Sequence, residues 1–252
     1  MNRNLTAAFK YQIKDNIKAI VIFYCIVCAV IVLISIGTAT ITTSGNSTMG
    51  GLDTSTSIFI FIAGIVSFKE PFRMLMQNGV SRKTMMKSKI LSALVITFFM
   101  AVCTTVLMLI GKALTSSMEN YNVLSTYEQT YVLKAAGQSG FMVQLYSFIF
   151  NFLQYLAVFI LGLFVALIFY RCGKAGKIAV GAGVPVTLFL VLPIIDSIFF
   201  KMKVTKSILK FFDFAFGITA GKPWAAFISF AVLAVLGLGL SWLLMRRADI
   251  KQ

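Results

Sequence analysis

The sequence predicts an all-α polytopic membrane protein, with six transmembrane helices in a single transmembrane domain over residues 1–252. Of its 252 residues, 59% are hydrophobic and 12% are charged, and the mean hydropathy is +0.90. A soluble domain carries about 25% charged residues and needs polar side chains to cover its surface. The composition therefore excludes a soluble enzyme, a secreted disulfide scaffold and a disordered chain.

Six apolar runs define the expected spans, because a membrane-crossing helix needs about 20 mostly apolar residues. The second run is the weakest, because it starts in Ser/Thr/Gly-rich sequence and soon meets Lys69. The first run is too long for the apolar part of a signal peptide, so we expect a permanent span. The predicted spans are 19–41, 54–68, 88–111, 145–170, 178–200 and 224–245.

The distribution of basic residues predicts the orientation. Most of the 23 Lys and Arg residues fall in the N-terminal segment, in the connections after spans 2 and 4, and in the C-terminal tail. By the positive-inside rule, both termini are cytoplasmic. The net charge of +15 is then a topology signal and an attraction to anionic membrane lipids, not a nucleic-acid footprint.

The N-terminal segment, 1–18, has an amphipathic pattern. Leu5, Phe9, Ile13 and Ile17 recur every four residues and form one stripe, while the basic residues lie off it. This pattern predicts a basic amphipathic helix in the cytoplasmic interface. Such a helix is either a membrane anchor or an elbow helix that couples a cytoplasmic partner to span 1.

The cytoplasmic segment 69–87 carries the most information. Phe72, Leu75 and Met76 have i, i+3, i+4 spacing, which predicts a short helix with one apolar face. Pro71 suits the first turn of that helix. A short helix with exposed apolar side chains needs a groove on a partner protein. The alternative is an interfacial loop that buries these side chains among lipid headgroups.

The end of this segment has the residues of a helix boundary. Asn78-Gly79 is expected to end the short helix, because glycine tolerates the left-handed conformation of a C-terminal cap. Ser81 can cap the next helix, whose first turns hold Arg82 and Lys83.

Two further segments face outward in this topology. The first, 112–144, is an external loop whose charges cancel, and we expect it to form a small cap. The second, 201–223, is rich in Phe and Lys and is too short and too charged to be a span. We expect a short external or re-entrant helix that dips into the outer leaflet, with a plain interfacial helix as the alternative.

Span 5 has features that suggest a transport path. Pro185 and Pro193 remove backbone hydrogen bonds and can kink the helix. Asp196 follows Pro193 within one turn, and a carboxylate at the bilayer centre costs roughly 2.5–3.5 kcal/mol. Near the outer interface, we expect Asp196 either to pair with Lys201 or Lys203 or to face the path.

Several chemistries are absent from the sequence. The chain has no histidine, so it has no His general base or His metal ligand. It also has no phosphate-binding loop of the G-x-x-x-x-G-K-[ST] type. Asp196 and Glu70 lie on opposite sides of the predicted membrane, which disfavours an intramembrane enzyme. We therefore expect no catalytic, cofactor-binding or metal residues on this chain, and we expect its energy source on another chain.

Taken together, these segments resemble the membrane (permease) subunit of a type-2 ABC exporter. The local stretch FRMLMQNGVSRK, from Phe72 to Lys83, resembles that of Gram-positive exporters of antimicrobial or cytolytic peptides. The resemblance implies an elbow helix at 1–18, a coupling helix between spans 2 and 3, and short external helices between spans 5 and 6. It also implies a bacterial plasma-membrane location, a second permease copy or homologue, and a cytoplasmic ABC-type ATPase that binds ATP and Mg.

The implied function is ATP-driven export of an amphipathic or apolar cargo, such as a cytolytic or antimicrobial peptide, a lipid or a drug. A passive channel, or an immunity or sensing membrane protein without an ATPase partner, is the alternative. The residues expected to dock the ATPase are Phe72, Arg73, Leu75, Met76, Asn78, Gly79, Arg82 and Lys83. Those of a possible path or exit are Asp196, Pro185, Pro193, Lys201 and Lys203.

Overall fold

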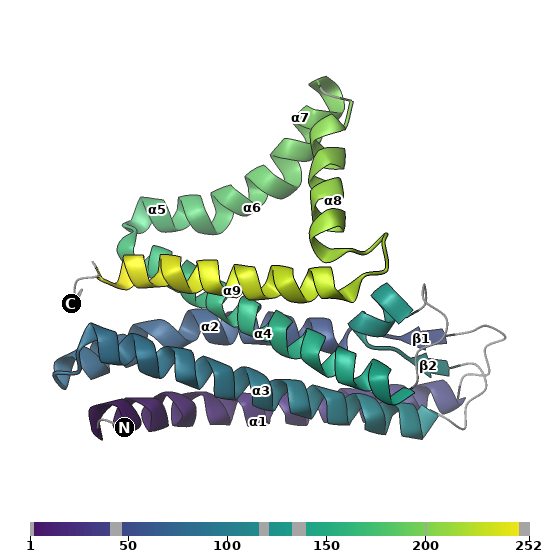
Figure 1. Cartoon of the computed structure of the whole chain (residues 1–252), viewed down its shortest axis with the longest axis horizontal. Helices are drawn as coiled ribbons and strands as arrows, with labels where there is room; N and C mark the ends of the chain where they lie inside the picture. The colour runs from purple at the N-terminus through teal and green to yellow at the C-terminus, as the bar shows by residue number, and fades with distance from the viewer. Residues whose placement is uncertain (1–2, 41–46, 116–120, 133–139, 200, 247–252) are drawn as a thin grey trace.

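The computed structural model describes residues 3–40, 47–115, 121–132, 140–199 and 201–246. Long helices pack along one another in a bundle (Figure 1). They are α1 (Arg3–Thr40), α2 (Leu52–Gln77), α3 (Arg82–Thr115), α4 (Gly140–Arg171) and α9 (Pro223–Arg246). Two short strands, β1 (Ser47–Met49) and β2 (Tyr121–Val123), pair in parallel at one end, near the π-helical turn η1 (Glu128–Val132).

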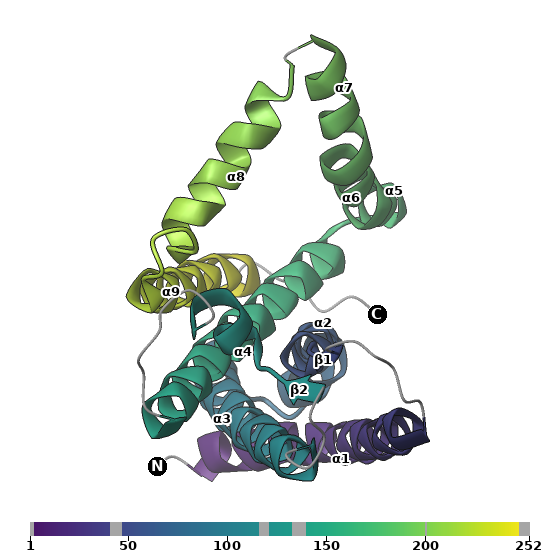
Figure 2. The same cartoon turned by 90° about the vertical axis from the view of Figure 1, so that its right-hand side faces the viewer.

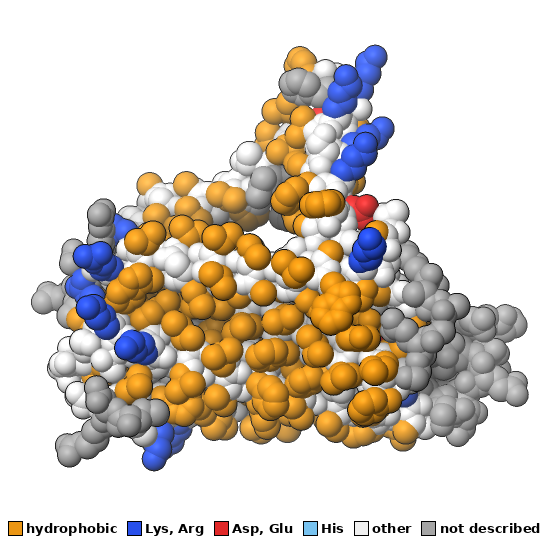
Figure 3. Space-filling model, viewed as in Figure 1, with side chains coloured by type: hydrophobic (Ala, Val, Ile, Leu, Met, Phe, Trp, Pro, Cys, Tyr) orange, Lys and Arg blue, Asp and Glu red, His pale blue; other side chains and the backbone are white. Residues whose placement is uncertain are grey.

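The bundle has one end rich in basic side chains, which we call the basic end. There α1 begins, α2 meets α3, and α4 and α9 end (Figures 1 and 2). Figure 3 shows Lys and Arg gathered at this end, beside a broad hydrophobic surface along the bundle. The strands lie at the opposite end. This distribution matches the alternation of basic and apolar segments in the sequence.

Four described helices are long and apolar enough to cross a membrane, by length and composition. They are Asn4–Leu33, Arg82–Leu114, Gly140–Arg171 and Pro223–Arg246. These helices are compatible with a multi-pass membrane protein. The described parts of predicted spans 2 and 5 are also helical; the helix of span 2 carries the charged residues Asp53, Lys69 and Glu70, and that of span 5 is interrupted by π-helical turns.

The N-terminal segment is not a separate helix, which corrects the expected elbow over 1–18. From Arg3, α1 runs unbroken into the first predicted span. The predicted apolar stripe of this segment does not include the residue that faces α3. That residue is Gln12, which is buried and makes two hydrogen bonds to α3. Its amide donates to Ser88 Oγ and accepts from Ser92 Oγ, both at 2.9 Å. These contacts hold the first turns against α3.

Helices α2 and α4 approach closely at Gly64 and Gly162. Their Cα atoms face each other so tightly that a Cβ added to Gly162 would lie 3.2 Å from the Gly64 Cα and overlap the Phe61 carbonyl. A Cβ on Gly64 would overlap the Phe159 carbonyl in the same way. Small residues at such crossings let helix backbones touch, which is the usual basis of helix association in lipid.

Beyond α4, the chain leaves the bundle as a helical arm (Figures 1 and 2). In chain order, the arm consists of α5 (Lys174–Ile178), η2 (Ala179–Gly183), α6 (Val184–Val186), η3 (Thr187–Val191) and α7 (Leu192–Phe199). The amphipathic helix α8 (Lys203–Phe216) then returns to α9. The two π-helical turns end just before Pro185 and Pro193, where the ring removes a backbone donor. A π-helical turn thus ends just before each of the prolines that were expected to kink this helix. The expected helix within 201–223 is α8.

Candidate functional site

The connection between α2 and α3 is a tight, capped turn at the basic end. Asn78 ends α2, and its side chain donates to the Met74 carbonyl at 2.8 Å. Gly79 follows with φ 72°, in the left-handed region. Ser81 Oγ accepts from the backbone N–H of Thr84 at 3.2 Å. The predicted helix end at Asn78-Gly79 and the predicted cap at Ser81 are confirmed.

The expected separate coupling helix within 69–87 is corrected, because its two halves are the last turns of α2 and the first turns of α3. Pro71 consequently lies inside α2 and not in a first turn. Since proline has no N–H, the Ser67 carbonyl one turn earlier loses its usual helical donor. The ammonium of the buried Lys89, on α3, donates to that carbonyl at 2.6 Å. This hydrogen bond compensates for the proline and joins the two helices.

Two of the expected docking side chains are buried. Phe72 and Leu75 have exposed fractions of 0% and 7%, so the expectation that they fill a groove on a partner is wrong. The Phe72 ring lies 5.1 Å from that of Phe68 and 5.5 Å from that of Tyr170 on α4, measured between centroids. Because α2 continues through this segment, its apolar face packs against the bundle.

The other expected docking residues remain at or near the surface of the turn. Asn78, Gly79 and Lys83 are exposed, and Arg73, Met76 and Arg82 are half-buried. The Arg82 guanidinium donates to the Arg246 carbonyl at 2.6 Å, which ties the turn to the end of α9. The neighbouring Met74 was not predicted, yet 44% of its surface is exposed. The turn thus presents one large apolar side chain among cations.

The candidate path residues lie on the arm and at the start of α8, and they are not brought near the docking turn (Figure 1). Asp196 is buried where α7 meets α8, and its carboxylate accepts from the backbone N–H groups of Val204 at 3.0 Å and Thr205 at 2.7 Å. It therefore caps α8 and forms no ion pair with Lys201 or Lys203 in the described structure. Both lysines are exposed. Of the prolines, Pro185 is exposed and Pro193 is half-buried.

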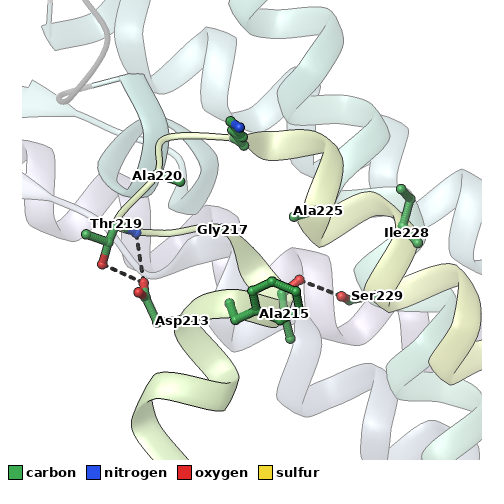
Figure 4. A pocket seen from close by; sticks show the side chains of 10 residues that line it. Asp213, Ala215, Gly217, Thr219, Ala220, Ala225, Ile228 and Ser229 are labelled. Carbon is green, nitrogen blue, oxygen red and sulfur yellow. Dashed lines mark hydrogen bonds between the residues drawn. The ribbon is translucent and has the colours of Figure 1, made fainter.

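A cavity of about 610 Å³ opens between the end of α8 and the start of α9 (Figure 4). Asp213 Oδ1 accepts from the N–H and the hydroxyl of Thr219, at 2.8 and 2.7 Å. Ser229 Oγ donates to the Ala215 carbonyl, which holds α8 against α9. Small and apolar side chains make up much of the lining, so the cavity suits an apolar group better than a charged one.

A buried polar layer near the strand end was missed by the sequence analysis. Asp53, in the first turn of α2, is fully buried. Its Oδ2 accepts from the backbone N–H of Thr126 at 2.7 Å, and its Oδ1 accepts from Asn151 Nδ2 of α4 at 3.2 Å. One helical turn further along, Gln154 Nε2 donates to Ser57 Oγ at 3.1 Å. The layer therefore fastens the segment around Thr126 to α2 and α4.

The same layer extends to α1 and α3 through hydroxyl groups. The Tyr24 hydroxyl donates to the Met100 carbonyl at 2.8 Å and lies 3.1 Å from Thr104 Oγ1. The buried Tyr155 hydroxyl donates to the same threonine at 3.4 Å. Four helices thus share hydrogen bonds inside the bundle, where unpaired polar groups would be costly.

Tyr131 links the segment that contains η1 to the end of α8. Its hydroxyl donates to the Phe216 carbonyl at the end of α8, at 2.6 Å. Burial raises the pKa of Tyr131 to about 12, so the hydroxyl keeps its donor proton at physiological pH. An ion pair between Lys112 and Glu128 holds the preceding part of the segment to α3.

Replacing Tyr131 with phenylalanine is expected to loosen the end of α8. The Phe216 carbonyl would lose its donor, which costs about 1 kcal/mol. Hydrogen exchange of the amides that follow Phe216 should speed up about fivefold, while the amides of α3 keep their rates. Equal exchange rates in the variant and the parent would show that this hydrogen bond does not hold α8.

The described residues contain no group of three or more His, Cys, Asp or Glu side chains placed to hold a metal ion. Comparison with models of known protein families, with curated proteins and with solved structures finds no match for this chain.

Proposed function

We propose that the chain is the permease subunit of an ATP-driven ABC exporter in a bacterial plasma membrane, of the Gram-positive type that its sequence resembles. It would move an amphipathic or apolar cargo, such as a cytolytic or antimicrobial peptide or a lipid, out of the cell. Both termini and the basic end would be cytoplasmic. A separate ATPase subunit would bind and hydrolyse ATP with Mg²⁺, and a second permease copy or homologue would complete the complex.

The observation that carries this proposal is the α2–α3 turn. Its ends are capped at Asn78 and Ser81, and Met74 and Lys83, on either side of it, are both exposed at the basic end. Exposed apolar side chains among charges are typical of protein-binding surfaces. We therefore assign the docking role to Met74, Asn78 and Lys83 at the surface of the turn.

The buried docking candidates have a different role in this proposal. Phe72 joins α2 to α4 through its contact with Tyr170, and Arg82 joins the turn to α9. A push on the turn by the ATPase would therefore displace several helices together, because packed interiors transmit strain. Such rigid coupling is what an ATP-driven rearrangement of the permease needs.

The arm supports the second permease copy and the six-span arrangement. Its exposed apolar side chains include Val186, Leu190, Ile194 and Ile198. An arm with so much uncovered apolar surface is suited to lipid and to another copy of the chain. Helix α2 buries polar residues such as Asp53 and Ser57 and exposes an apolar stripe at Ile58, Ile62 and Val66, so it can cross the membrane with its polar face in protein and its apolar face in lipid. The cavity between α8 and α9 would take the apolar part of the cargo near the exit.

The docking assignment is tested by the double variant Met74→Asp/Lys83→Glu. We expect recovery of the ATPase with the tagged chain to fall at least about tenfold, as for loss of an interface hot spot. The measurement is cross-linking in native membranes, gentle extraction and identification of the co-purifying proteins by mass. Lys14→Glu, at an exposed position on α1 near the same end, is the matched charge control and should leave recovery unchanged.

Equal recovery of the ATPase with the double variant would refute the docking surface. Recovery of the parent chain without any nucleotide-hydrolysing partner would refute the exporter proposal itself. That second result would favour the passive channel or the immunity and sensing protein.

A further inference from the structure

A second cavity, of about 410 Å³, lies at the basic end between α2, α4 and the start of α5. Three cationic residues contribute to its lining from two parts of the chain: Lys69 and Arg73 on α2, and Lys177 on α5. The remaining lining residues are Ile65, Phe68, Ala166, Phe169 and Tyr170. The lining therefore contains cations and apolar groups and no carboxylate.

The cavity has a polarity gradient along α2. Ile65 lies one helical turn, or about 6 Å, before Lys69, and Arg73 lies one turn further toward the basic end. On α4, Ala166 likewise precedes Tyr170 by one turn. The apolar wall thus lies toward the middle of the bundle and the cations lie toward its end. A phospholipid has the same arrangement, with its phosphate outside and its acyl chains inside.

The arrangement of charge favours an anion at the mouth of the cavity. Like charges four residues apart on a helix repel each other, and Lys69 and Arg73 have this spacing. Glu70 lies three residues before Arg73 on α2 and also interacts electrostatically with Tyr11 of α1, but it is not among the residues that line the cavity. An anion between Lys69 and Lys177 would lie close to two exposed cations of the lining and would offset their charge.

We propose that this cavity binds the phosphate group of an anionic phospholipid, with Lys69, Arg73 and Lys177 around the phosphate and the apolar wall against the glycerol and upper acyl chains. Basic pockets between transmembrane helices on the cytoplasmic side bind such headgroups in other proteins. The site joins α2 and α4, which pack together, to the start of the arm. A lipid held there would fix the arm where it leaves the bundle.

The test uses the full-length chain in nanodiscs of phosphatidylcholine with a minor fraction of phosphatidylglycerol. Native mass spectrometry measures the phosphatidylglycerol that stays bound. Each cation near a headgroup contributes about fivefold in affinity, so Lys69→Gln/Lys177→Gln should weaken retention about 25-fold. Lys69→Arg/Lys177→Arg, which keeps the charges, should retain the lipid. Lys14→Gln/Lys18→Gln, at exposed positions on α1, is the matched control and should also retain it.

A second measurement separates the lipid from a soluble anion. Inorganic phosphate is titrated into the chain in pure phosphatidylcholine nanodiscs. Saturable phosphate binding that the glutamine variant abolishes, without preferential retention of phosphatidylglycerol, would keep the phosphate site but overturn its lipid source. Equal loss of lipid in the glutamine variant and in the α1 control would show general charge attraction and overturn the site. Because the variants leave Met74 and Lys83 unchanged, ATPase recovery tests the exporter proposal separately.

Discussion

Replacing Gly162 with alanine is expected to destabilise the bundle by about 3 kcal/mol, at the upper end of the cost of overpacking. The added methyl group would overlap the Phe61 carbonyl and press on the Gly64 Cα. Both obstacles are backbone atoms, so no rotamer change can make room. The two helices must separate, and the contacts between α2 and α4 on both sides of the crossing would be lost. Gly64→Ala should act alike, because its methyl group would meet the Phe159 carbonyl.

The measurement is the temperature at which the purified chain loses its monodisperse elution. Gly239→Ala is the matched control, because Gly239 lies in α9 and an added Cβ there meets no atom within 4 Å. Alanine favours a helix over glycine by about 1 kcal/mol, so the control should be neutral or stabilising. If all three variants shifted the midpoint in the same direction, the close α2–α4 approach would be refuted.

Replacing Asp53 with leucine is expected to cost about 3 kcal/mol and to release the segment around Thr126 from the bundle. The Thr126 N–H and the Asn151 amide would both lose the carboxylate that accepts their hydrogen bonds. Each would remain near an apolar side chain, and a buried donor without an acceptor is costly. Hydrogen exchange at Thr126 should accelerate strongly, because that amide relies on Asp53 as its acceptor.

The matched variant Asp53→Asn should have a smaller effect. Its amide oxygen can still accept from Thr126, and its amide nitrogen can donate to the Asn151 oxygen, which is buried without a hydrogen-bond partner in the structure. Asp15→Leu removes the same charge from an exposed position on α1 and should leave Thr126 protected. Protection of Thr126 in Asp53→Leu equal to that in the parent would show that the carboxylate does not hold this segment.

The positions of the helices were largely predictable, because apolar runs and charged breaks repeat at membrane-spanning lengths. The boundaries at Asn78-Gly79 and Ser81 were also predictable, since cap residues act locally. The break at residue 18 was wrong because Gln12 makes tertiary hydrogen bonds to α3, which no local pattern reveals. The polarity of α2 likewise has a tertiary cause, since Asp53 and Ser57 have partners on other segments.

The position of the candidate docking turn in the chain was predictable, but which side of it faces solvent was not. Spacing identified an apolar face at Phe72 and Leu75, but it could not show which neighbour covers that face. The continuation of α2 through Pro71 decided this, because it turns the face toward α4. The basic cavity was not predictable at all, since Lys69 and Lys177 are far apart in the sequence and meet only in the folded chain.

The hydrogen bond from Lys89 to the Ser67 carbonyl has a consequence for how the chain enters the bilayer. A lone Lys89 in lipid is costly, and the Ser67 carbonyl above Pro71 would lack a donor there. The Lys89 ammonium and the Ser67 carbonyl can hydrogen-bond to each other only when α2 and α3 are already side by side. We therefore expect the translocation machinery to release these two helices into the membrane together, as a preformed hairpin, rather than one after the other.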